Sequence, residues 1–213
     1  MANPKYDEIQ FAHEFDISVE SREIFLHDEI DSDVAARFIK NMRILGARSN
    51  KPIVIHQYSV GGDWSAGMAI YDIIYFFSCP VLFITHGCAA SMGSVIPQSV
   101  RPGKGYRITN PNCDWLIHEG HIFMDHTNRA AASTHEANKI ATEKMYDVYV
   151  GACKGAEYFK GEKESKIRAF LKRKLSSKED WWISSEEAVQ YGFADGVLGT
   201  EGYESIEKIK EYL

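Results

Sequence analysis

Cysteine is scarce in this chain of 213 residues: the sequence holds only four, at Cys79, Cys88, Cys113 and Cys153. No two of them form a C-x-x-C pair, which argues against a zinc ribbon, a thioredoxin-like redox site or a disulfide scaffold. The first ten residues also lack the basic-then-apolar pattern of a secretory signal. We therefore predict reduced thiols and a cytoplasmic location.

Long apolar runs and an excess of positive charge are missing as well. The longest apolar stretch, residues 70–77, is too short to span a membrane. Lys and Arg number 24 against 30 Asp and Glu, so the formal net charge of −6 argues against a general nucleic-acid binder. No G-x-x-x-x-G-K-[ST] phosphate-binding motif is present, so any ATP-driven step needs another chain.

The composition is that of a globular domain. Hydrophobic residues make up 45% and charged residues 25%, without an internal repeat or a linker, so we expect residues 1–213 to form a single domain. The charge is uneven, because residues 160–178 hold eight basic and two acidic side chains. Ile167, Phe170 and Leu171 recur there at helical spacing, so we interpret this basic segment as the solvated face of a packed helix.

Strand and helix patterns alternate through the middle of the chain. Short apolar runs at 51–58 and 81–85 predict buried strands, and the apolar residues 64–77 between them predict a helix. Further elements are expected as strands at 106–109, 113–118 and 196–198, and as helices at 91–100, about 127–153 and 162–175. The alternation predicts an α/β domain with a parallel sheet and right-handed crossovers.

Two patterns near the N-terminus lead to further expectations. Apolar residues alternate with polar ones over residues 15–20, and a second short run follows at 23–27, which together predict a pair of strands or one bent strand. A helix is expected to begin at residues 31–33, where acidic and hydroxyl side chains can cap it. We expect this helix to end at about Leu45, because Gly46 is a typical helix terminator.

The segment GCAASMG, residues 87–93, contains the first candidate for catalysis. Ser91 stands among small residues, directly after a predicted strand and at a predicted helix start. Small neighbours let a substrate approach, and unpaired N–H groups at a helix start favour a developing oxyanion. The segment differs from the better-known G-x-S-x-G motif, and tight packing at a strand–helix junction is the alternative interpretation.

His118 and Asp180 are the other two candidates. His118 ends the apolar run WLIH, and the ends of parallel strands are where sites assemble. Asp180 precedes Trp181 and Trp182, whose rings would lower the dielectric around its carboxylate. A structural histidine and a turn-capping aspartate are the simpler interpretations of each residue alone. A metal site at His118-x-x-His121 is disfavoured because HEGH is not HExxH, so we expect no metal and no cofactor.

Taken together, Ser91, His118 and Asp180 suggest nucleophilic acyl transfer. Ser91 would attack, His118 would accept its proton, and Asp180 would orient the imidazole. The glycine pair Gly61-Gly62, which interrupts the chain after a predicted strand, would supply a further backbone N–H.

These residues lie in a series of segments that resembles the ClpP family of self-compartmentalising serine peptidases over residues 59–195. SVGG followed by AGMAIYD resembles the family's S-P-G-G…A-G-x-A-I-Y-D, and GCAASMGS resembles G-x-A-A-S-M-G-S. PN followed by IH resembles P-N…I-H, and DWWISSEEA with YGFAD resembles D-x-F-M-S-x-x-E-A…Y-G-L-I-D. Ordered matches of this kind are far more specific than any one of them alone.

The resemblance implies a ClpP/crotonase-like fold of repeated β-β-α units with a handle helix at about 127–153. It implies Ser91, His118 and Asp180 as a catalytic triad and the backbone N–H groups of Gly62 and Met92 as the oxyanion hole. It also implies a serine endopeptidase that cuts unfolded polypeptides or short peptides inside a homo-oligomeric chamber. That chamber would be one heptameric ring or two stacked rings, served by an AAA+ unfoldase that carries the ATPase.

The chain departs from the family pattern in the regions that govern assembly. Val60 stands where the family has proline, and the segment 119–132 lacks the Gly-rich strand of the handle. The spacing between His118 and Asp180 is longer than usual, and the N-terminus looks strand-like where the family has a helix. Two other functions therefore stay open: a crotonase-type acyl-CoA enzyme, and a non-catalytic ClpP-like ring subunit. A complete Ser–His–Asp set favours the peptidase over both.

Overall fold

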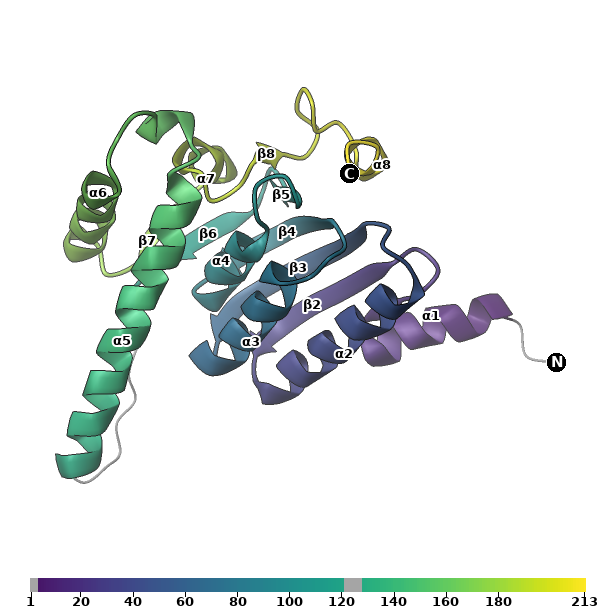
Figure 1. The fold of residues 1–213 in the computed structure, drawn as a ribbon, viewed down its shortest axis with the longest axis horizontal. Coiled ribbons are helices and arrows are strands. Elements are labelled where there is room, and N and C mark those ends of the chain that lie inside the picture. The colour runs from purple at the N-terminus through teal and green to yellow at the C-terminus, as the bar shows by residue number, and fades with distance from the viewer. Residues whose placement is uncertain (1–3, 121–127) are drawn as a thin grey trace.

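The computed structural model describes residues 4–120 and 128–213, and a mixed sheet lies at its centre (Figure 1). The sheet follows the order β1 (Ile17–Ser18), β2 (Glu23–Ile30), β3 (Ile53–Gly62), β4 (Val81–Ala90), β5 (Gly105–Thr109) and β8 (Gly196–Val197). Off this path, β6 (Asp114–Ile117) pairs with β4, and β7 (Trp181–Ile183) pairs with β6. Only β1 and β7 run antiparallel to their partners among these pairs, which confirms the predicted α/β domain with a mostly parallel sheet.

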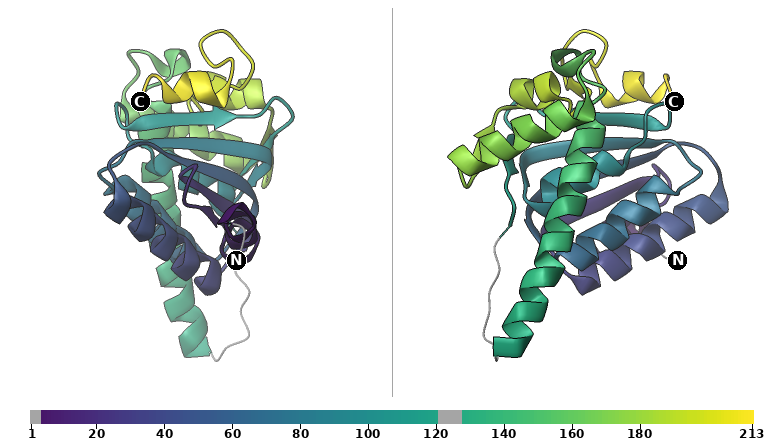
Figure 2. Two further views of the ribbon diagram at one scale, coloured as in Figure 1. Left: turned by 90° about the vertical axis from the view of Figure 1, so that its right-hand side faces the viewer. Right: turned by 60° about the vertical axis from the view of Figure 1, so that its left-hand side comes forward.

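Helices connect the strands and cover both faces of the sheet. They are α1 (Pro4–Phe15), α2 (Ser32–Arg48), α3 (Trp64–Tyr75), α4 (Met92–Val95), the 3₁₀ helix η1 (Ile96–Ser99), α5 (Asn128–Cys153), the 3₁₀ helix η2 (Glu157–Phe159), α6 (Glu164–Ser177), α7 (Ser185–Tyr191) and α8 (Ile206–Lys210). Helices α2 and α3 lie side by side on one face, and α5 extends well past the sheet (Figures 1 and 2). None of the described helices combines the length and the apolarity needed to cross a bilayer.

Strand β4 shows why both faces of the sheet are buried. Val81 and Phe83 contribute to the main core beneath α2 and α3, whereas Leu82 and Ile84 contribute to a smaller core. Ile209 of α8 closes this smaller core and is itself fully buried. A strand covered on both sides needs apolar residues at every position, which explains the unbroken run VLFI.

The N-terminal expectation is confirmed only in part, because β1 and β2 do form an antiparallel pair but the residues before them are helical. Residues 4–15 form α1, so Phe15 is the last residue of a helix, and the strand that follows holds only Ile17 and Ser18. Asp16 lies between them with φ at 56°, a left-handed conformation that ends the helix. The alternation of apolar residues therefore spans a helix end and a two-residue strand.

The expected end of the second helix was wrong. Asp31 caps α2 as expected, since its side chain accepts from the backbone N–H groups of Asp33 and Val34. The helix, however, continues through Gly46 to Arg48. A Cβ at residue 46 would lie 2.4 Å from the ring of Phe77, so this glycine serves close packing and not helix termination.

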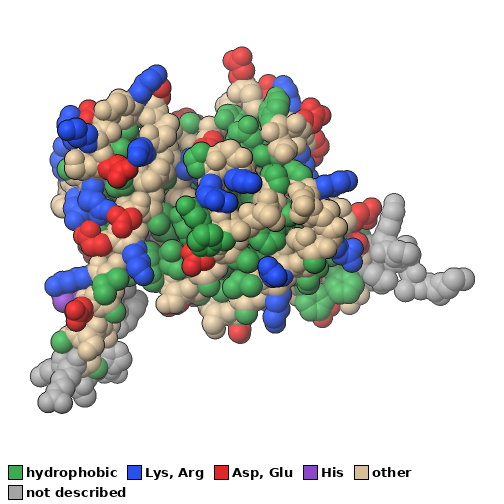
Figure 3. Space-filling model, in the orientation of Figure 1, with side chains coloured by type: hydrophobic (Ala, Val, Ile, Leu, Met, Phe, Trp, Pro, Cys, Tyr) green, Lys and Arg blue, Asp and Glu red, His purple; other side chains and the backbone are tan. Residues whose placement is uncertain are grey.

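The basic segment forms a packed helix with a charged outer face, as interpreted from its spacing. The apolar side chains of α6 are buried, and the guanidinium of Arg168 pairs with Glu143 and Asp147 of α5. Lys172 Nζ lies 3.0 Å from the same Glu143 carboxylate. Figure 3 shows Lys and Arg side chains gathered at the upper left, where α6 lies, with acidic side chains beside them. The charges of α6 thus help to join it to α5.

A pair of histidines lies on the sheet face that carries the smaller core. Nδ1 of His56 in β3 lies 3.0 Å from Nε2 of His86 in β4, and the two rings stack with centroids 5.2 Å apart. Burial, reinforced by the neighbouring His86, lowers the pKa of His56 from its ordinary 6.5 to about 4. Between pH 6.5 and about 4, the folded protein therefore keeps the His56 imidazole neutral, whereas an unfolded chain would protonate it.

We expect the free energy of unfolding to fall as the pH drops from 6.5 towards 4, because the unfolded state then binds more protons at His56 than the folded state. Urea unfolding at a series of pH values measures this slope. The variant His56→Gln should show a shallower slope, whereas replacing the exposed His13 of α1 by glutamine should leave it unchanged. Equal slopes in the wild type and in His56→Gln would contradict the prediction.

Candidate active site

Strand β4 changes partner along its length, and this change positions the site. Residues 81–85 pair with β5, whereas residues 88–90 pair with β6. Gly87 lies at the change with φ at +58°, a conformation that glycine adopts without strain. The end of β4 therefore lies beside β6 and not beside β5, while Ala89 still pairs with Ser59 of β3 on the other side.

The register of three strands brings the candidate residues together. Ala90 pairs with Leu116, and the next backbone N–H, that of Ser91, donates to the Leu116 carbonyl at 3.0 Å. Strands β6 and β7 then pair antiparallel, with Ile117 opposite Trp181. His118 follows one of these residues and Asp180 precedes the other, so the two side chains face each other beyond the last pair.

The side chains of Ser91, His118 and Asp180 lie in a row, with the imidazole between the hydroxyl and the carboxylate. His118 Nε2 lies 2.7 Å from Ser91 Oγ, and His118 Nδ1 lies 3.3 Å from Asp180 Oδ1. The imidazole is well shielded, with 10% of its side chain exposed, whereas 48% of the Asp180 side chain is exposed. The arrangement can therefore remove a proton from the serine hydroxyl, and the carboxylate can stabilise the resulting imidazolium.

The two tryptophans that were expected to cover Asp180 are buried to very different extents. Trp181 is 3% exposed and packs against Phe170 and Tyr191, but Trp182 is 52% exposed. Successive residues of a strand point to opposite faces, so the two tryptophans cannot both cover one neighbour. Asp180 consequently lies half in water, which screens its attraction for the imidazolium.

Ser91 has a strained backbone. Its φ of 54° and ψ of −122° lie outside the regions that side chains other than glycine normally adopt. Strain of this kind costs about 1–3 kcal/mol and persists only where the surroundings enforce it. Here the hydrogen bond to Leu116 holds one side of the residue, and α4 begins at the next residue on the other.

The glycine pair ends β3, and its first member, Gly61, lies directly against the serine. A Cβ on Gly61 would lie 2.5 Å from Ser91 Cβ and 3.1 Å from the backbone nitrogen of Met92. A Cβ on Gly62 would lie 2.3 Å from the carbonyl oxygen of Ile30 in β2. Two backbone segments thus meet at Ser91, and only glycine allows them to approach so closely. The family resemblance assigns a role to the N–H of Gly62 but does not reveal this steric role of Gly61, although the adjacent glycines are a visible signal in the sequence.

A cavity of about 120 Å³ opens beside the histidine, lined by His118, Glu119, Gly120, Leu175 and Glu179. The hydroxyl of Tyr146 donates to the Glu119 carboxylate at its edge. Across residues 4–120 and 128–213, no three His, Cys, Asp or Glu side chains converge as a metal site. His121, the second member of the disfavoured metal pair, and the rest of residues 121–127 lie outside the described residues.

Comparison with known proteins gives consistent matches along most of the chain. A family model described as Clp protease matches residues 7–201. The ATP-dependent Clp protease proteolytic subunit 1 of Chlamydia muridarum is 33% identical over 183 residues, 84% of this chain and 88% of that protein. The proteolytic subunit 3 of Streptomyces avermitilis is 28% identical over 84% of this chain and 75% of its own length.

A solved structure shares the fold. It is a ClpP1 mutant from Listeria monocytogenes, with a TM-score of 0.72, 22% sequence identity, and coverage of 90% of this chain and 96% of that one.

The close approach of Gly61 to Ser91 gives a direct test of the site geometry. Gly61→Ala should lower the rate at which a fluorophosphonate labels Ser91 by about tenfold or more, because the new Cβ displaces the serine or the Met92 N–H. Gly103→Ala is the matched control, since Gly103 also has a positive φ but has open space around its Cβ position. Equal labelling rates for the two variants would contradict the assignment.

Proposed function

This chain belongs to the Clp protease family, and we propose that it is a serine endopeptidase in which Ser91, His118 and Asp180 form the catalytic triad. The observation that carries the proposal is the 2.7 Å approach of His118 Nε2 to Ser91 Oγ, with the Asp180 carboxylate 3.3 Å from the other ring nitrogen. Neighbouring strands hold all three residues by their register, and membership of a peptidase family supports peptide-bond hydrolysis as the reaction.

In the proposed reaction, His118 Nε2 accepts the hydroxyl proton as Ser91 Oγ attacks the carbonyl carbon of the peptide bond. The carbonyl oxygen becomes an oxyanion, which the backbone N–H groups of Gly62 and Met92 would stabilise. The imidazolium then gives its proton to the leaving amine nitrogen, and the C–N bond breaks. Water repeats the sequence on the resulting acyl-enzyme, which releases the acid and restores Ser91.

We extend the proposal to assembly and partners. The relatives are named as proteolytic subunits of an ATP-dependent protease, which supports a homo-oligomeric chamber with the ATPase on a separate chain. A heptameric ring, single or stacked in pairs, would enclose the active sites and so spare folded neighbours. Its substrates would be unfolded polypeptides or short peptides, delivered by an AAA+ unfoldase.

Replacing the nucleophile tests the proposed triad. Ser91→Ala should lower the hydrolysis of a fluorogenic peptide by at least about a thousandfold, because no other group can form the acyl-enzyme. Fluorophosphonate labelling, followed by intact mass, should disappear with it, while Ser99→Ala serves as the control. Hydrolysis that survives in Ser91→Ala would rule out the triad, and a wild-type protein that takes no label would favour a non-catalytic ring subunit.

Native mass spectrometry tests the proposed chamber. We expect a species with the mass of seven or fourteen copies of the 24.1 kDa chain, present in both the wild type and Ser91→Ala. The two proteins should assemble alike because the substitution removes only one hydroxyl. A monomer at micromolar concentration would contradict the chamber but not the triad.

A further inference from the structure

The helix that follows the nucleophile is too short to hold its own position. Helix α4 has four residues, Met92–Val95, and a single helical turn has little intrinsic stability. The last carbonyl groups of any helix also lack partners within the helix. The surroundings must therefore fix α4, and with it the backbone of Ser91 and the N–H of Met92.

Three backbone carbonyls of this segment each accept a hydrogen bond from a buried side chain. The Ser91 carbonyl accepts from Ser94 Oγ at 2.7 Å, and the Gly93 carbonyl accepts from Gln57 Nε2 at 2.7 Å. The Ser94 carbonyl accepts from Gln98 Nε2 at 3.0 Å. Gln57 and Ser94 are fully buried and Gln98 is 8% exposed, so water does not compete for these bonds.

The hydroxyl of Ser94 is itself held by α5. It has one hydrogen, which it donates to the Ser91 carbonyl, so the Tyr149 hydroxyl must be the donor in the 2.7 Å contact between the two side chains. Tyr149 is buried, and burial raises the pKa of its phenol, so it keeps the proton that it donates. The rotamer of Ser94 is thereby determined.

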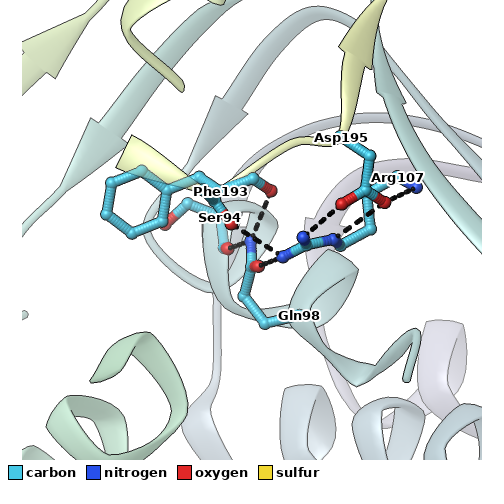
Figure 4. Close-up of polar contacts among 6 residues, drawn as sticks. Ser94, Gln98, Arg107, Phe193 and Asp195 are labelled. Carbon is cyan, nitrogen blue, oxygen red and sulfur yellow. Dashed lines mark hydrogen bonds and ion pairs between the residues drawn. The ribbon is translucent and has the colours of Figure 1, made fainter. Parts of the chain in front are cut away.

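An ion pair sets the orientation of Gln98, as Figure 4 shows. Arg107 can only donate hydrogen bonds, so the oxygen of the Gln98 amide faces Arg107 Nη1 at 2.6 Å. The NH₂ group must then point the other way, where it donates to the carbonyls of Ser94 and Phe193 at 3.0 Å each. The Asp195 carboxylate fixes Arg107 through its guanidinium and its backbone N–H.

The remaining side of α4 rests on the backbone of β3. A Cβ on Gly93 would lie 2.7 Å from the Ser59 carbonyl oxygen, so helix and strand are in direct contact there. Gln57, two residues earlier in the same strand, holds the Gly93 carbonyl. A buried carbonyl that loses its donor costs about 1–3 kcal/mol, so any shift of α4 away from these donors is opposed.

We propose that Ser94, Gln57 and Gln98 are positioning residues for the reaction. They act through backbone carbonyls to keep Ser91 Oγ at His118 and the Met92 N–H directed at the developing oxyanion. The inference rests on the proposed peptidase function. Since these side chains touch the backbone of α4 and not the substrate, their loss weakens interactions made in the transition state and leaves substrate binding in place.

The test uses three single variants of the full chain, Ser94→Ala, Gln57→Met and Gln98→Met, with Ser99→Ala as the matched control. Ser99 Oγ is equally buried and donates to the Ile96 carbonyl at 2.6 Å in the next turn, so its removal costs a comparable bond outside α4. We expect kcat to fall by about tenfold in the three variants with KM within about twofold, and the control to keep both values. The rate of fluorophosphonate labelling should fall in parallel with kcat.

Gln57→Met keeps the test decisive if another variant fails to fold. Among the described residues Gln57 Oε1 accepts no hydrogen bond, so methionine removes the donor to Gly93 together with a buried unpaired acceptor and keeps the side-chain length. A Gln57→Met protein that unfolds cooperatively and retains the kcat of the control would overturn the inference. A wild-type protein that neither hydrolyses peptides nor takes the label would instead overturn the proposed function, and the positioning roles with it.

Discussion

The candidate site depends on the change of partner within β4. Had all ten residues of this strand paired with β5, Ser91 would lie at the far end of the main sheet, away from β6. The change at Gly87 brings Ser91 beside Leu116, and the antiparallel pair β6–β7 then places His118 opposite Asp180. Backbone hydrogen bonds thus position three residues that are distant in sequence, before any of their side chains interact.

The buried polar side chains serve the same region. The core is apolar almost throughout, yet Gln57, Ser94 and Gln98 are buried beside the strained serine, where each donates to a backbone carbonyl. An apolar side chain would fill the same volume but would remove a hydrogen bond to a carbonyl in a medium of low dielectric. The strain at Ser91 is therefore balanced by a well-bonded environment around it, and the Arg107–Asp195 pair extends that environment to the start of β8.

Much of the fold could be predicted from the sequence because its signals are local. Unbroken apolar runs indicated β3 and β4, and helical spacing indicated the buried face of α6. The failures occurred where a local pattern had two physical causes. Gly46 looked like a helix end but allows Phe77 to pack closely, and Phe15 looked like part of a strand but ends α1. In both cases a tertiary contact or a single left-handed residue decided the outcome.

The sequence by itself determined the family and singled out Ser91, His118 and Asp180 as the candidate residues, because side-chain chemistry and motif order are present in the residues themselves. Only the tertiary structure decided how these residues meet: the distances between them, the half-exposed state of Asp180, and the contact of Gly61 with Ser91. It also decided which buried amides support α4. The physical reason is that strand register and close packing depend on pairs of residues far apart in the chain, and no local pattern contains that information.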